Sequence, residues 1–78
     1  MAREQVTEIL AEMVANVLST SVAVGDTVAP GDSVMLLESM KMEIPVLVEV
    51  AGTIRAVKVG PGDVVQEGTV LVEITPAG

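Results

Sequence analysis

A repeat with a spacing of 37 residues is the feature that most constrains this 78-residue chain. When residues 14–38 are laid over residues 51–75 without a gap, similar apolar residues coincide, such as Val17 with Ile54 and Leu37 with Ile74. The identical pairs are Val22 and Val59, Gly25 and Gly62, Asp26 and Asp63, Val28 and Val65, and Gly31 and Gly68. One copy is too short to bury its own apolar face, so we expect the two copies to pack on each other around a pseudo-twofold axis.

The aliphatic composition favours strands within each copy. Sixteen residues are valine, and seven glycines and four prolines are scattered between them. Branching at Cβ suits a pleated surface, and glycine next to aspartate suits a tight turn. Each copy is therefore predicted to be a strand, a Gly-Asp turn, a short strand, a glycine turn and a strand. The expected class is all-β, a flattened barrel or sandwich of two halves.

The composition also excludes several functions. The chain has no cysteine, histidine or aromatic residue, and 11 acidic against four basic residues give a net charge of −7. Nucleic acid and anionic membranes would be repelled, and the usual neutral-pH acid–base residue is missing. The longest uncharged stretch, residues 13–25, is too short for a spanning helix. We expect a soluble cytoplasmic protein that is not an enzyme. We also expect no metal site, because the spacing of its acidic residues matches no calcium loop.

Two patterns compete in the first 18 residues. Apolar residues from Val6 to Leu18 fall at helical spacing, whereas the repeat predicts a strand from Val14 onwards. Because the repeat extends over more positions than the helical spacing, we predict a strand from Val14 onwards. Residues 7–13 are also predicted to be a strand. Residues 1–8 are left undecided or frayed, and residues 1–6 are expected to be a disordered leader of one domain that spans residues 1–78.

The segment Glu38-Ser39-Met40-Lys41-Met42-Glu43 has an unusual composition for a turn. Strands are predicted on both sides, at residues 34–38 and 43–50, and Pro45 places the second at a sheet edge or close to the turn because proline donates no ladder hydrogen bond. The repeat pairs Lys41 with Gly78, so the turn should lie at the opposite end of the barrel from the chain termini. The other lysine, Lys58, is predicted to lie in the middle of a strand. A competing interpretation makes Met40 and Met42 core residues and Lys41 a solubilising charge.

The Glu-Ser-Met-Lys-Met segment, placed between two Gly-Asp halves, resembles the biotinyl domain of biotin-dependent carboxylases over roughly residues 7–74. The resemblance implies a flattened eight-stranded barrel with biotin joined to Lys41 by an amide bond that a biotin protein ligase makes. Met40 and Met42 match the methionines that flank the modified lysine. Glu38 matches the acidic residue three places before it, and all three are expected to contribute to recognition by the ligase. Ala15 departs from the family pattern, in which glycine is common at this position.

The family also implies a role and partners. A biotin carboxylase would load the cofactor and a carboxyltransferase would unload it, in an acyl-CoA or another biotin-dependent carboxylase, with the isolated domain a monomer. A carrier needs an exposed attachment point and leaves the chemistry to its cofactor, which agrees with the composition. Two alternatives stay open, a lipoyl-type acyl carrier and an unmodified structural module of the same fold. Methionine on both sides of Lys41 favours biotin over lipoate.

Overall fold

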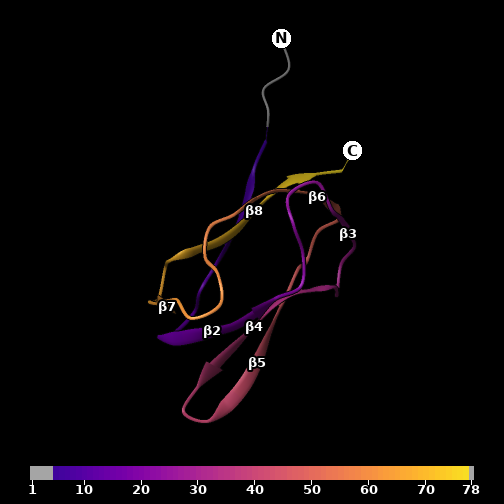
Figure 1. The fold of residues 1–78 in the computed structure, drawn as a ribbon. Helices are drawn as coiled ribbons and strands as arrows, with labels where there is room; N and C mark the ends of the chain where they lie inside the picture. The colour runs from indigo at the N-terminus through magenta and orange to yellow at the C-terminus, as the bar shows by residue number, and fades with distance from the viewer. Residues whose placement is uncertain (1–4, 78) are drawn as a thin grey trace.

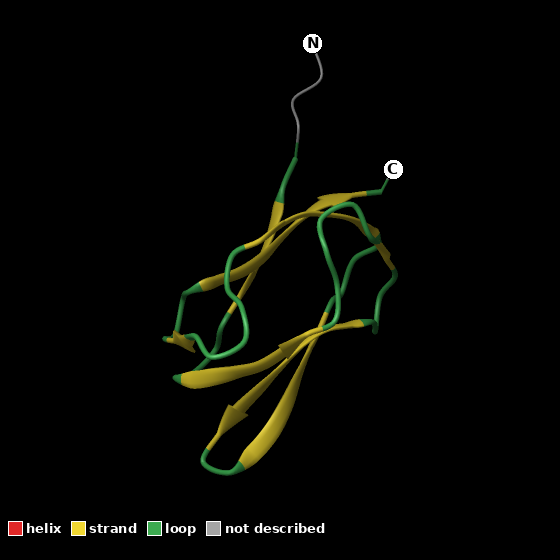
Figure 2. Cartoon of the chain, in the orientation of Figure 1, coloured by secondary structure: helices red, strands yellow, loops and turns green. Residues whose placement is uncertain are grey.

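Eight β-strands form the regular secondary structure of the computed structural model, which describes residues 5–77 (Figures 1 and 2). They are β1 (Thr7–Leu10), β2 (Ala15–Thr20), β3 (Thr27–Val28), β4 (Ser33–Ser39), β5 (Met42–Leu47), β6 (Gly52–Val57), β7 (Val64–Val65) and β8 (Val70–Pro76). They make two antiparallel four-stranded sheets, in the orders β1-β8-β6-β3 and β5-β4-β2-β7. The predicted all-β, two-halved architecture is confirmed. No helix occurs within residues 5–77, so none there could cross a membrane.

The two halves interlock through a pseudo-twofold arrangement. Adding 37 to the bounds of β2, β3 and β4 gives the bounds of β6, β7 and β8. Each short strand pairs with a strand of the other copy: β3 pairs with β6, and β7 pairs with β2. Hydrogen bonds repeat in the same way: Val17 N–H donates to the Asp63 carbonyl oxygen and Ile54 N–H to that of Asp26, both at 2.8 Å. Each half thus completes the sheet of the other.

The core lies between the sheets and contains only aliphatic residues and methionine. Thirteen apolar side chains in the described part of the chain are buried. Val34, Met35, Leu71, Val72 and Ile74 are fully enclosed, and they come from β4 and its counterpart β8. These two strands pair with an edge strand on one side and with β2 or β6 on the other, which explains why they carry the deepest residues.

The Gly-Asp turns are formed as the repeat predicts. Gly25 and Gly62 have φ of +97° and +92°, a region that favours glycine. The carboxylate of the following aspartate closes each turn: Asp26 accepts from Ala23 N–H at 2.9 Å, and Asp63 from Gly60 N–H at 2.8 Å. The glycines at these turns therefore have a structural role.

Three predicted strand boundaries are wrong. The strands expected at residues 7–13 and 43–50 end at Leu10 and Leu47, and Lys58 follows the end of β6. The first two end because the chain turns inward at the equivalent residues Ala11 and Val48, which are buried and bond to the other copy's glycine turn. Of the expected leader, residues 1–4 lie outside the described part of the chain. Gln5 and Val6 are exposed and carry no regular structure.

Candidate functional site

The hairpin of β4 and β5 carries Lys41 at one end of the molecule. Ser39 pairs with Met42, so Met40 and Lys41 form a two-residue loop. Figure 1 shows this loop at the opposite end of the sandwich from the start of β1 and the end of β8. β5 is an edge strand, as Pro45 predicts. The expected position of the turn at a tip is confirmed.

Both loop residues have a backbone conformation that side chains usually avoid. Met40 has φ of +54° and Lys41 has φ of +65°. Positive φ at both central residues is typical of type I′ hairpin loops, which usually contain Asn-Gly or Gly-Gly. The left-handed conformation costs an ordinary residue roughly 1–2 kcal/mol. The sequence keeps two long side chains at positions where glycine would be more stable.

The side chains at the tip extend into solvent. Met40 is 91% exposed and Met42 is 62% exposed. Lys41 is exposed too, and within residues 5–77 its side chain makes neither a hydrogen bond nor an ion pair. The competing interpretation, in which Met40 and Met42 fill the core, is therefore wrong. What the loop offers is a free primary amine between two exposed thioethers.

Two carboxylates lie opposite each other at the base of this loop. Glu38 on β4 pairs directly with Glu43 on β5, and Glu38 is half-buried whereas Glu43 is exposed. Like charges in directly opposed positions destabilise a hairpin. Neither carboxylate forms an ion pair with Lys41 in the described structure. The pair therefore makes the base of the hairpin acidic without restraining the lysine.

A hollow of about 330 Å³ lies beside the loop, and its apolar wall was not predicted from the sequence. Met40 and Lys41 line it from the hairpin, Val14 from the segment before β2, and Val64 from β7. The hydroxyl of Ser39 donates to the Val14 carbonyl oxygen at 3.0 Å and fixes the hairpin against this wall. We call this feature the tip hollow.

The repeat itself contains the signal that could have identified the tip hollow. Val14 and Val64 are 63% and 66% exposed, so neither side chain is held at its position by burial in the core. Their equivalents at the other end of the sandwich are Ala51 and Thr27, which are also exposed. Since the backbone is the same at both ends, the larger apolar side chains belong to the end that carries Lys41.

The conformation of Met40 leads to a stability prediction. Met40→Gly should raise the free energy of unfolding by about 1 kcal/mol, because glycine accepts positive φ and little packing is lost. The matched control is Met42→Gly. Met42 lies in a strand, so this change should lower the free energy of unfolding by roughly 0.5–1 kcal/mol. Urea unfolding followed by circular dichroism measures both. Equal effects of the two changes would contradict the assignment of strain to residue 40.

Comparison with known proteins gives a consistent picture. The family model described as biotin-requiring enzyme matches residues 5–74. A biotinylated protein TB7.3 homolog of Mycobacterium leprae is 50% identical over 68 residues, covering 87% of this chain and 96% of the relative. A biotin/lipoyl attachment protein of Bacillus subtilis is 42% identical over 64 residues, covering 82% of this chain and 88% of the relative.

Solved structures with the same fold are parts of much larger chains. The Kluyveromyces lactis urea carboxylase matches with a TM-score of 0.85 and 27% identity, over 95% of this chain and 6% of that one. A single-chain, multi-domain long-chain acyl-CoA carboxylase matches with a TM-score of 0.87 and 26% identity, over 99% of this chain and 8% of that one. The likeness therefore covers one small portion of each carboxylase.

Proposed function

Because this chain belongs to the biotin/lipoyl attachment family of biotin-requiring enzymes, we propose that it is a biotin carboxyl carrier modified at Lys41. The observation that carries the proposal is the exposed amine of Lys41 on the strained loop, between two exposed methionines. Relatives that match most of their own length are named biotinylated or biotin/lipoyl attachment proteins.

The chemistry of attachment agrees with the geometry. In its uncharged form the Lys41 amine attacks the activated carboxyl carbon of biotin, the activating group leaves, the amine loses a proton, and an amide remains. An arginine could not replace it, since its guanidinium stays protonated and is a poor nucleophile. An unpaired amine has no ion pair to break before it enters a ligase site. The loop backbone, fixed by the ladder between β4 and β5, holds the attachment point away from the body.

The role of this chain after attachment is positional. Biotin held by Lys41 would supply the group that carries a carboxyl between partner sites. The domain supplies a rigid body, an exposed attachment point and the surfaces by which partners bind it. We propose a biotin protein ligase, a biotin carboxylase and a carboxyltransferase as those partners, in a cytoplasmic acyl-CoA carboxylase. A relative 44% identical over 66 residues is an acyl-coenzyme A carboxylase subunit of M. leprae, whereas urea carboxylase has the same fold.

Modification of the purified chain tests the proposal. The protein is incubated with ATP, a biotin protein ligase and biotin, and in parallel with a lipoate ligase and lipoate. Intact mass and peptide mapping then identify the adduct and its position. The expected product carries one biotin on Lys41 and none on Lys58. Lipoylation alone would support a lipoyl carrier, and no adduct with either ligase would support a structural module.

The tip hollow leads to a prediction about the ligase. Changing Val14 and Val64 together to threonine should lower kcat/KM for biotinylation about tenfold, because each loses apolar contact area with the ligase near Lys41. Both side chains are exposed, so stability should change little. The matched control is Ala51→Ser, at the position equivalent to Val14 on the opposite end of the sandwich, and it should leave kcat/KM unchanged. An equal rate for all three proteins would exclude the hollow from the ligase contact.

A further inference from the structure

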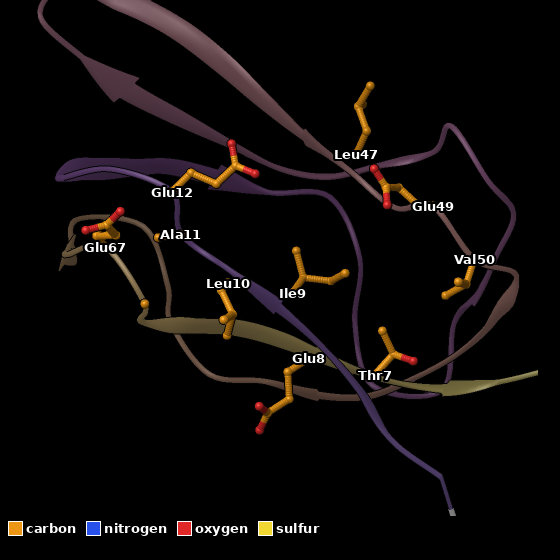
Figure 3. A pocket seen from close by; sticks show the side chains of 11 residues that line it. Thr7, Glu8, Ile9, Leu10, Ala11, Glu12, Leu47, Glu49, Val50 and Glu67 are labelled. Atoms are coloured by element: carbon orange, nitrogen blue, oxygen red, sulfur yellow. The ribbon is translucent and has the colours of Figure 1, made fainter.

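The two sheets leave a groove between their open edges on the side wall of the sandwich. β1 pairs only with β8 and β5 only with β4, so each is an edge strand. Between β1 and the segment after β5 lies a hollow of about 670 Å³, shown in Figure 3. A smaller hollow of about 200 Å³ continues it along β5, and the two share Leu10, Ala11, Glu12 and Leu47. We call the two together the seam groove.

The walls of the seam groove are apolar and unusually exposed. Leu10 is 46% exposed and Leu47 is 51% exposed, and these leucines are equivalent positions 37 residues apart. Ile9 and Val50 are half-buried along the same wall. In Figure 3 the Ile9 side chain lies in the middle of the groove. An apolar surface of this kind between two strand edges invites a further chain to cover it.

The ionisable side chains that line the larger hollow are all carboxylates. They are Glu8, Glu12, Glu49 and Glu67, and no lysine or arginine of the described residues lines it. Glu12 and Glu49 are again equivalent positions of the repeat, so acidic residues lie near both ends of the apolar wall. Figure 3 shows Glu12 and Glu49 on opposite sides of Ile9. A cationic occupant is therefore favoured, and a second copy of this acidic chain, with net charge −7, would be repelled.

The edges determine the shape of the occupant. Pro45 removes a donor from the β5 edge, whereas the equivalent residue in β1 is Glu8, which keeps its N–H. β1 is thus the edge to which another strand can bind. In an extended segment, alternate side chains face opposite ways, so apolar residues can contact the wall while cations face the carboxylates.

We propose that the seam groove binds an extended segment of a partner protein in which apolar residues alternate with lysine or arginine. The groove lies on the side wall, whereas Lys41 lies at the tip, so a chain bound there would hold the carrier body and leave the attachment point free. The inference does not depend on whether Lys41 is modified.

The test uses the full unmodified chain, labelled with ¹⁵N, and a blocked hexapeptide that alternates lysine with valine. Binding should shift the amide signals of residues 7–12, 47–50 and 67–68 and leave those of residues 38–43 in place. Changing Leu10 and Leu47 to serine should weaken binding about tenfold. A second variant, with Glu12→Gln and Glu49→Gln, should weaken it too and reduce its dependence on salt. This variant alters no buried side chain, so it keeps the test valid if the serine variant fails to fold.

Two control peptides decide the alternatives. A peptide with three valines followed by three lysines has the same composition, and one that alternates glutamate with valine has the opposite charge. Neither should bind the groove. Equal binding of the block peptide, or shifts centred on Glu38 and Glu43, would show charge attraction without a groove and overturn the proposal. Signals of the groove that change with protein concentration alone would assign it to a second copy, which also overturns it.

Discussion

Lys41→Arg should abolish biotinylation of this protein while leaving the fold unchanged. Arginine keeps the positive charge and tolerates the same exposed position, but its guanidinium forms no comparable amide. The tip side chain makes no described contact that the fold depends on. We therefore expect no adduct by intact mass, no signal with labelled avidin, and a urea unfolding midpoint within error of that of the unmodified parent chain.

Lys58→Arg is the matched control for this change. Lys58 is the other lysine of the chain, and its side chain is exposed as well. It follows the end of β6, and its N–H donates to the Leu71 carbonyl oxygen at 2.9 Å. The control should be biotinylated at the parent rate, because the Lys41 loop is unchanged. Lys58 itself has neither a positive-φ backbone nor flanking methionines. An adduct that persists in Lys41→Arg and disappears in Lys58→Arg would refute the assignment of the site.

The fold could be predicted from the sequence because the repeat constrains it twice. Every predicted feature around Gly25 has an equivalent around Gly62, and both glycines have the expected positive φ. The position of Lys41 at the tip followed from the repeat as well, since its counterpart is at the chain end. Strand ends were predicted less well. Ala11 and Val48 resemble strand residues locally, and only the bonds they make to the other copy show that the chain turns inward there.

The surroundings of Lys41 could be predicted only in part. Met40 and Met42 are adjacent to it in the chain, and the motif identifies them without a structure. The tip hollow and the seam groove join residues that are far apart in sequence, such as Val14 with Val64, and Leu10 with Leu47. A single sequence does not indicate which exposed valine lies near Lys41. Comparing exposed residues at equivalent positions of the two copies offers a way to find such sites.

Gly52→Ala should be among the most destabilising single changes to this fold, although alanine is the residue at the equivalent position 15. A Cβ on Gly52 would collide with the Thr75 carbonyl oxygen and the Ile74 side chain, and would lie 3.0 Å from Pro76 Cα. Two of these contacts involve the backbone of β8, which cannot move without disturbing its ladder with β6. Overpacking of this kind costs about 1–3 kcal/mol, and we expect the upper end. A domain of this size has a total stability of roughly 4–12 kcal/mol.

The reverse change in the first copy, Ala15→Gly, separates steric collision from chain flexibility. Ala15 is buried and already carries a Cβ at the position of β2 equivalent to Gly52, and glycine there should cost only about 0.5–1 kcal/mol. Circular dichroism must follow the unfolding, because the chain has no aromatic residue for fluorescence. Backbone entropy alone would make Gly52→Ala stabilising, because alanine has fewer unfolded conformations than glycine, so an unchanged or raised free energy of unfolding would refute the close approach of β6 to β8. If Gly52→Ala costs several times more, the two copies share a backbone but differ in how tightly their strands pack, and this would explain why the repeat matches in pattern more than in identity.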